Sequence, residues 1–284
     1  MNLIVQGRDV PTPSLKQLAK LTGATAIEAV SLTAFRLVVT DDSPRVEAAS
    51  FCEENSLDCG WVPAGRHIGD FGLLVMDMDS TLITIECIDE IADMQGLKPQ
   101  VSAITEAAMH GEIDFAESLR RRVSLLAGLD QSALQRVYDE RLQLSPGAET
   151  LLAAIRAAGI RTLLVSGGFT FFTERLQSRL GLDYTAANTL EVADGKLTGR
   201  VLGDIVDAQG KADWLNRVRI ELGLDRGQVI AMGDGANDLK MMAEAGISIA
   251  YRAKPVVRAQ AAYALNQVGL DGLIPLLGEN GRKG

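Results

Sequence analysis

The chain is poor in aromatic residues (5%), and among its 284 residues it has two histidines and three cysteines. The cysteines, Cys52, Cys59 and Cys87, are odd in number and show no CxxC spacing, which argues against a disulfide framework or a zinc site. We therefore expect three buried thiols in a protein of the reducing cytoplasm.

Long apolar runs and basic tracts are also missing. No stretch reaches the roughly 18 uninterrupted apolar residues that span a bilayer, and Met1–Asp9 lacks the apolar region of a signal peptide. The formal net charge is −9, and no basic tract offsets it, which argues against nucleic acid or an anionic membrane as a partner. A small molecule remains as the expected partner, and a homodimer is compatible with the sequence.

Two common nucleotide-binding motifs are absent too. The chain has no Walker A sequence, and the GDG at 233–235 is not a dinucleotide fingerprint because Asp238 stands in place of the final glycine. An EF-hand reading of the segment that starts at Asp77 also fails. Leu82 and Ile88 occupy the positions that require Gly and Glu.

The length and an apolar fraction of 47% fit two domains with ordinary cores. Residues 1–66 predict a small α+β domain in βαββαβ order, with strands at 2–6, 24–30, 34–40 and 58–62 and helices at 13–22 and 43–56. This order resembles ligand-binding domains of the ACT type. The glycines of segment 63–69 predict a linker.

Residues 70–284 predict an α/β domain. Short apolar runs at 71–76, 162–165, 229–232 and 247–250 are typical of parallel strands that helices cover on both faces. Ser145 and Pro146 predict the start of the helix before the second run. Between about 84 and 144 the pattern becomes helical, with a capping box at Asp114 and Glu117. We expect a parallel sheet with a helical cap inserted after its first strand.

Distinctive polar residues follow three of the predicted strands. The first strand is followed by Asp77 and Asp79, the second by Ser166 and Gly167, and the third by Asp234, Asn237 and Asp238. Because ligands of open parallel sheets bind outside the carboxyl ends of the strands, we expect these side chains to converge.

The residue types suit phosphoryl transfer. Several carboxylates form the all-oxygen site that Mg²⁺ prefers, and one of them can be a nucleophile while a second moves protons, roles that Asp77 and Asp79 could divide. Ser166 and the glycines after it offer a hydroxyl and backbone N–H groups to a phosphate. Lys211, at the expected start of a helix, could neutralise negative charge. A single DxD pair is common in structural roles, so the prediction depends on the whole set.

Together these motifs resemble the haloacid dehalogenase superfamily of phosphohydrolases. The resemblance rests on DMDST at 77–81, SGG at 166–168, Lys211 and GDGAND at 233–238, and it covers about residues 70 to 275. It implies a Rossmann-like parallel sheet with a cap domain between the first and second motifs.

A narrower resemblance links the chain to the phosphoserine phosphatase family. It rests on the segment STLITIECID around Glu86 and on MHGEIDFAESLRRRVSLL at 109–126. It implies that Asp77 is the nucleophile and Asp79 the general acid and base. It also implies that Mg²⁺ is held by Asp77, the backbone carbonyl of Asp79 and Asp234, with Asp238 in support.

The same resemblance implies how the substrate is held. The phosphate is expected to contact Ser166, Gly167, Lys211 and Asn237. Glu86 is expected to meet the substrate ammonium and Arg122 its carboxylate, because a guanidinium is a natural bidentate partner of a carboxylate. Met109 and Phe115 are expected to close over the ligand.

The expected activity is Mg²⁺-dependent hydrolysis of O-phospho-L-serine, the last step of serine biosynthesis. Two alternatives stay open at this point. One is another small-molecule phosphatase or phosphotransferase of the superfamily, for example one acting on phosphohomoserine. The other is a ligand-sensing regulator without catalysis.

Overall fold

The computed structural model describes residues 1–40 and 44–278, and for Met109 the backbone alone. Across these ranges the strands form two sheets, one of four strands in the order β2-β3-β1-β4 and one of seven strands in the order β11-β10-β9-β5-β6-β7-β8. Within the same described ranges, no helix is long and apolar enough to cross a membrane.

The smaller sheet and its helices have the predicted βαββαβ order. The elements are β1 Asn2–Gln6, α1 Thr12–Thr22, β2 Ala26–Ala29, β3 Ala34–Val38, α2 Arg45–Glu54 and β4 Asp58–Val62. All neighbouring strands are antiparallel. One face of the sheet packs with α1 and α2 around Leu3, Val5, Leu18 and Cys52.

The larger sheet carries the α/β part of the chain. Its strands are β5 Leu73–Met76, β6 Arg161–Phe169, β7 Tyr184–Ala193, β8 Lys196–Leu202, β9 Val229–Gly233, β10 Ile247–Tyr251 and β11 Tyr263–Leu265. Its helices include α7 Ala148–Ala157, α8 Thr170–Leu180, α9 Ala208–Glu221, α10 Leu239–Ala243, α11 Pro255–Arg258 and α12 Leu273–Leu276. All strand pairs are parallel except β7 with β8.

Helices cover both faces of this sheet, as the continuous apolar runs predict. Along β5, Leu74 and Met76 face a core that contains α7 and α8. The alternate residues Leu73 and Val75 face a second core with α9 and α10. This period of two follows from the pleat of a strand. The predicted parallel sheet is confirmed.

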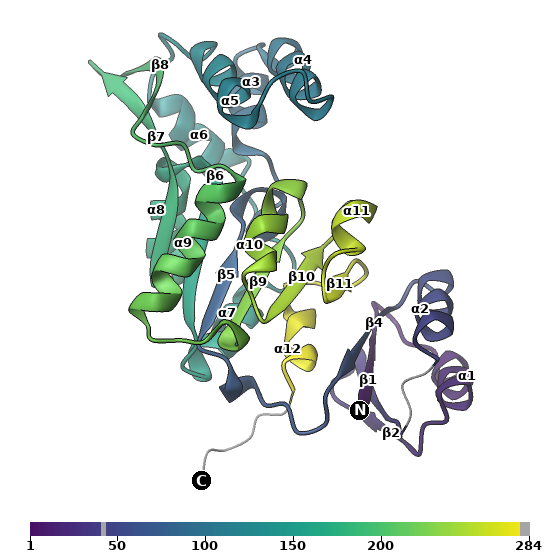
Figure 1. Cartoon of the computed structure of the whole chain (residues 1–284). Coiled ribbons are helices and arrows are strands. Elements are labelled where there is room, and N and C mark those ends of the chain that lie inside the picture. The colour runs from purple at the N-terminus through teal and green to yellow at the C-terminus, as the bar shows by residue number, and fades with distance from the viewer. Residues whose placement is uncertain (41–43, 279–284) are drawn as a thin grey trace.

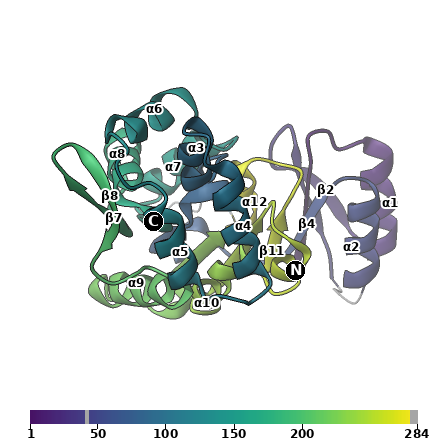
Figure 2. The ribbon, with the colours of Figure 1, turned by 90° about the horizontal axis from the view of Figure 1, so that it is seen from above.

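In the described chain, four α-helices lie between β5 and α7, where the cap was expected. They are α3 Cys87–Met94, α4 Lys98–Met109, α5 Phe115–Ser124 and α6 Ser132–Glu140. The insertion begins and ends at one narrow stem, where Ile83 pairs with Leu144 and Thr84 N donates to Gln143 O at 3.0 Å. Helices α3, α4 and α5 gather beyond one end of the sheet (Figure 1), and from above they overlie it (Figure 2).

The two sheets meet through the outer face of the smaller one. Ile4 and Val62 belong to the same buried cluster as Leu276 of α12, and Tyr263 Oη donates to Trp61 O at 2.9 Å. Figure 2 shows the smaller sheet on the side of the molecule opposite the β7–β8 hairpin. The division of the chain into residues 1–66, 70–284 and a cap at about 84–144 stays a proposal.

Asp58 is the main polar anchor between the two sheets. Its buried carboxylate accepts from the backbone N–H groups of Asn266, Gln267 and Val268, the nearest at 2.8 Å. Burial raises the pKa of Asp58, and these hydrogen bonds oppose the rise. The carboxylate therefore caps the chain where it leaves β11.

Replacing Asp58 by alanine is expected to lower the free energy of unfolding by about 2–4 kcal/mol, because it leaves buried N–H groups without an acceptor. Urea denaturation measures this loss. Asp9→Ala is the matched control, since Asp9 is exposed on the same unit. Equal urea midpoints for the two variants would contradict the anchoring role.

Candidate active site

Asp77 lies at the carboxyl end of the central strand β5, where the chain turns sharply. The residue is 4% exposed, and its Oδ1 accepts from Met78 N at 2.8 Å. Backbone hydrogen bonds from Leu82 to Asp77 and from Ile83 to Met78 close the turn. Ser80 has a φ of 55°, a conformation that costs of order 1–3 kcal/mol in a residue other than glycine. The turn fixes the Asp77 carboxylate at the edge of the sheet.

A buried lysine joins two of the predicted acidic residues. Lys211 comes from the first turn of α9, where the side chain of Asp207 caps the helix. Its Nζ lies 2.6 Å from Asp77 Oδ1 and 2.7 Å from Asp238 Oδ1. Lys211 and Asp238 are 1% and 0% exposed, so water screens these ion pairs very little. One ammonium group therefore holds two carboxylates in fixed positions.

The site has more negative charge than this lysine can balance. Burial and the charge of Asp238 raise the pKa of Asp77, and Lys211 opposes the rise. Burial and the charge of Asp238 also raise the pKa of Asp234, to about 6. For Lys211, burial acts to lower the pKa, but the charges of Asp238 and Asp77 prevail and raise it. A bound cation would relieve the repulsion among the carboxylates.

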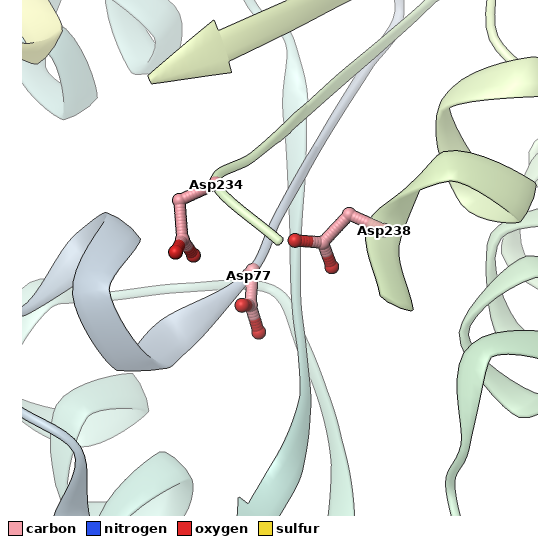
Figure 3. Close-up of side chains that lie close together, drawn as sticks. All are labelled: Asp77, Asp234 and Asp238. Carbon is pink, nitrogen blue, oxygen red and sulfur yellow. The ribbon is translucent and has the colours of Figure 1, made fainter. Parts of the chain in front are cut away.

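Asp77, Asp234 and Asp238 are arranged as a metal site requires. One ligand oxygen from each lies within 4.8 Å of the other two. Figure 3 shows the three side chains close together. An all-carboxylate donor set matches Mg²⁺, a hard cation that prefers oxygen ligands. The residues therefore fit a magnesium ion.

The carboxylate of Asp79 is held apart from that cluster. Its Oδ1 accepts from Cys87 N at 2.9 Å and its Oδ2 from Ser166 Oγ at 3.2 Å. Burial raises the pKa of Asp79, and the bonds from Cys87 and Ser166 oppose it. A carboxyl group with a raised pKa, fixed two residues from Asp77, is suited to proton transfer.

A cavity of about 480 Å³ opens between the sheet edge and the cap. The predicted site residues on its wall are Asp77, Asp79, Glu86, Phe115, Arg122, Gly167, Lys211, Asp234 and Asn237. Asp238 and Ser166 are fully buried behind this wall. Each is hydrogen-bonded to a residue of the wall, Asp238 to Lys211 and Ser166 to Asp79. The side chain of Met109 lies outside the described residues.

Glu86 and Arg122 bring opposite charges to the cap side of the cavity. Although Glu86 is exposed at the cavity wall, desolvation of its carboxyl and the charge of Asp79 raise its pKa to about 7. Ser80 Oγ donates to Glu86 Oε1 at 2.7 Å. Burial lowers the pKa of Arg122, and the charges of Asp89, Glu86 and Asp79 oppose this. The cavity thus offers an anionic and a cationic group outside the carboxylate cluster.

Phe115 explains why glycine is needed at the second strand end. A Cβ atom at Gly167 would lie 2.8 Å from Phe115 Cζ, and one at Gly168 would lie 2.7 Å from Asp79 Oδ2. Any side chain there would displace the aromatic ring or the acid. The two glycines therefore let cap and core close on the same space.

The cavity wall also contains polar residues that the sequence analysis did not single out, namely Asp89, Thr105, Ser118 and Lys254. Asp89 lies three residues after Glu86, and Ser118 three residues after Phe115. Helical spacing would have placed both beside a predicted residue. Lys254 comes shortly after β10, so the strand-end rule applied to a fourth strand would have found it.

Two family models match the chain. Residues 74–243 match the haloacid dehalogenase-like hydrolases, and residues 3–47 match a domain of unknown function. The first match contains every predicted site residue of the α/β part. The second match covers most of the smaller sheet, and it assigns no activity to that part of the chain.

Known proteins agree with the first match. A phosphoserine phosphatase of Polaromonas is 56% identical over 74% of this chain and 91% of its own length. The unliganded structure of a probable phosphoserine phosphatase from Vibrio cholerae has a TM-score of 0.86 at 39% identity, covering 97% of this chain and 86% of that one.

A hydrolase structure from Salmonella enterica serovar Typhi extends over both sheets. Its TM-score is 0.89 at 34% identity, and the similarity covers 98% of this chain and 99% of that one. That protein is described as a member of the same hydrolase family. With the residues that line the cavity, these matches establish that the chain belongs to the haloacid dehalogenase-like hydrolases, in the group of the phosphoserine phosphatases.

Proposed function

We propose that this chain hydrolyses O-phospho-L-serine to L-serine and phosphate, with Asp77 as the nucleophile. The observation that carries the proposal is that Glu86 and Arg122 line the same cavity as Asp77 and Lys211. Phosphoserine carries an ammonium, a carboxylate and a phosphate. The cavity offers a partner of opposite charge or a nucleophile for each.

In the first step, an Asp77 carboxylate oxygen attacks the phosphorus and the bond to the serine oxygen breaks. Asp79 gives its proton to that oxygen, so the leaving group departs as a neutral alcohol. The raised pKa of Asp79 supports this role, because it increases the fraction of the acid that carries a proton. The product of the step is an acyl phosphate on Asp77.

In the second step, water attacks the same phosphorus while the ionised Asp79 takes a proton from the water. The bond between phosphorus and Asp77 breaks, and both acids return to their starting states. Lys211 lies 2.6 Å from Asp77 and stabilises the negative charge that develops beside it in both steps. Gly167 and Asn237 line the cavity, and we assign them to the phosphate oxygens.

We propose that Mg²⁺ is held by Asp77 and Asp234, with Asp238 in support and the backbone carbonyl of Asp79 as a further ligand. When bound, the cation supplies positive charge to the phosphoryl oxygens. The close approach of the three carboxylates and the raised pKa values of Asp77 and Asp234 support this assignment.

A phosphate-release assay on a panel of phosphomonoesters tests the proposed substrate. The panel contains L- and D-phosphoserine, phosphohomoserine and p-nitrophenyl phosphate. If the proposal is right, kcat/KM is highest for L-phosphoserine and much lower for p-nitrophenyl phosphate, which has neither an ammonium for Glu86 nor a carboxylate for Arg122. A higher kcat/KM for phosphohomoserine, or equal values across the panel, would overturn the assignment.

Removal of divalent metal is expected to abolish turnover, since the carboxylates would repel the phosphate without a cation. The measurement is phosphate release from L-phosphoserine in excess chelator, followed by addition of Mg²⁺ and, separately, Ca²⁺. Activity should return with Mg²⁺. Full turnover in protein shown by elemental analysis to be metal-free would contradict this role.

A further inference from the structure

Lys254 is a cation of the active-site cavity to which nothing so far gives a role. It follows β10, the strand beside β9, and its side chain is exposed on the cavity wall. In the described part of the chain its ammonium group has no hydrogen bond or ion pair, whereas Lys211 is held between Asp77 and Asp238.

The backbone around Lys254 is firmly held although its side chain is exposed. The carbonyl oxygen of Lys254 accepts from Val257 N at 2.9 Å and from Arg258 N at 3.1 Å. Val257 is fully buried in the core that the larger sheet forms with α9 and α10. On the other side of Lys254, Arg252 N donates to Leu265 O at 2.8 Å. The loop therefore presents one cation from a fixed position.

The charge around the cavity explains what such a cation would do. Five carboxylates line the wall, those of Asp77, Asp79, Glu86, Asp89 and Asp234, and the whole chain has a net charge of −9. A phosphomonoester carries about −1.5 to −2 at neutral pH, so it is repelled as it approaches. Lys211 is buried and paired, and Arg122 lies in the field of the nearby Asp89 and Glu86 charges.

We propose that Lys254 draws the phosphoryl group of the substrate into the cavity and contacts it before the phosphate reaches Asp77. Its place favours the phosphate over the amino-acid end of the substrate. The neighbouring strand β9 leads to Asp234 and Asn237, whereas the amino-acid partners Glu86 and Arg122 belong to the cap. The inference rests on the proposed phosphatase function and adds a binding residue to it.

Substitution of the lysine tests the proposal through substrate capture. Lys254→Gln is expected to lower kcat/KM about 10-fold at low ionic strength, to change kcat by less than about 2-fold, and to lose most of its effect in about 0.5 M salt. Lys254→Glu should lower kcat/KM further, and Lys254→Arg should restore most of it. Lys240→Gln is the matched control, because Lys240 is an exposed lysine of the adjacent helix α10 that does not line the cavity.

Either of two results with L-phosphoserine would overturn the proposal. One is a loss in Lys254→Gln no larger than that in Lys240→Gln, and the other is a loss that salt does not reduce or that falls on kcat. With p-nitrophenyl phosphate the expected loss is the same, because the lysine acts on the phosphate. A loss of kcat/KM confined to phosphoserine would indicate that Lys254 contacts the amino-acid end of the substrate, which would also contradict the proposal.

The second substrate separates this proposal from the proposed function. If the unchanged enzyme hydrolyses p-nitrophenyl phosphate but not phosphoserine, the assignment of the substrate fails while Lys254 is still tested. Competitive inhibition by inorganic phosphate gives an independent reading. Its inhibition constant should rise about 10-fold in Lys254→Gln at low salt, and an unchanged constant would count against the contact.

Discussion

Asp77→Asn is expected to lower kcat by at least about 10³-fold, because an amide cannot form the acyl phosphate. The change keeps the shape of the side chain, so the sheet and the turn after β5 should stay intact. The measurement is single-turnover phosphate release from L-phosphoserine in Mg²⁺. Beryllofluoride, which mimics the acyl phosphate, should bind the unchanged enzyme and not the variant.

The ion pair with Lys211 requires a stability control for this variant. The Asp77→Asn change would make one partner of a buried ammonium neutral, although Asp238 would still bind that ammonium at 2.7 Å. Circular dichroism and a urea titration show whether the variant is folded under assay conditions. A folded variant with near-normal turnover would assign the nucleophile to water or to Ser166.

Arg122→Ala is expected to lower kcat/KM for L-phosphoserine by about 10- to 150-fold, since a hydrogen bond to a charged group contributes roughly 1.5–3 kcal/mol. Turnover of p-nitrophenyl phosphate should change much less, because that substrate has no carboxylate. Glu86→Gln should show the same selectivity through the ammonium. Steady-state kinetics with both substrates measure the difference.

Arg120→Ala is the matched control for the cap helix. Arg120 is exposed on α5 and lies outside the cavity wall, so its removal should change neither substrate. Equal losses of kcat/KM for both substrates in a folded Arg122→Ala variant would contradict recognition of an amino-acid substrate. The enzyme would then be a phosphatase of general specificity.

The site residues at the carboxyl ends of the strands could be predicted from the sequence, because their position follows from one rule. A buried parallel strand reads as a short apolar run, and the residue after it faces the ligand edge. Asp77, Gly167 and Asp234 follow such runs, and all three line the cavity. The fold was predictable for the same reason, since β6, β9 and β10 each contain the apolar run that indicated them and β5 lies within the run at 71–76.

Other features depend on contacts that no local pattern contains. Ser145 was predicted to cap α7, but Gly147 is the residue before the helix, and Ser145 N donates to Leu82 O at the stem of the cap. This tertiary contact holds Ser145 in the stem of the cap, two residues before the N-cap Gly147. The buried Asp58 anchor has the same origin, because its partners lie more than 200 residues later in the chain.

The hairpin of β7 and β8 was missed although the sequence contains its signal. Asp194 and Gly195 form a two-residue turn with φ values of 50° and 74°, and an Asp-Gly pair between apolar residues is typical of such hairpins. The hairpin matters to the site because it supports the cap, with Gly128 N donating to Leu197 O at 2.8 Å.

In the proposed reaction the phosphoryl group passes through a covalent intermediate on Asp77. The most direct test is rapid acid quench of the enzyme during turnover of L-phosphoserine in Mg²⁺, followed by proteolysis and mass spectrometry. We predict one phosphoryl group on the peptide that contains Asp77, absent from Asp77→Asn and removed by hydroxylamine. Rapid phosphate release with no phosphoryl group on that peptide, or with the group on Ser166, would contradict it.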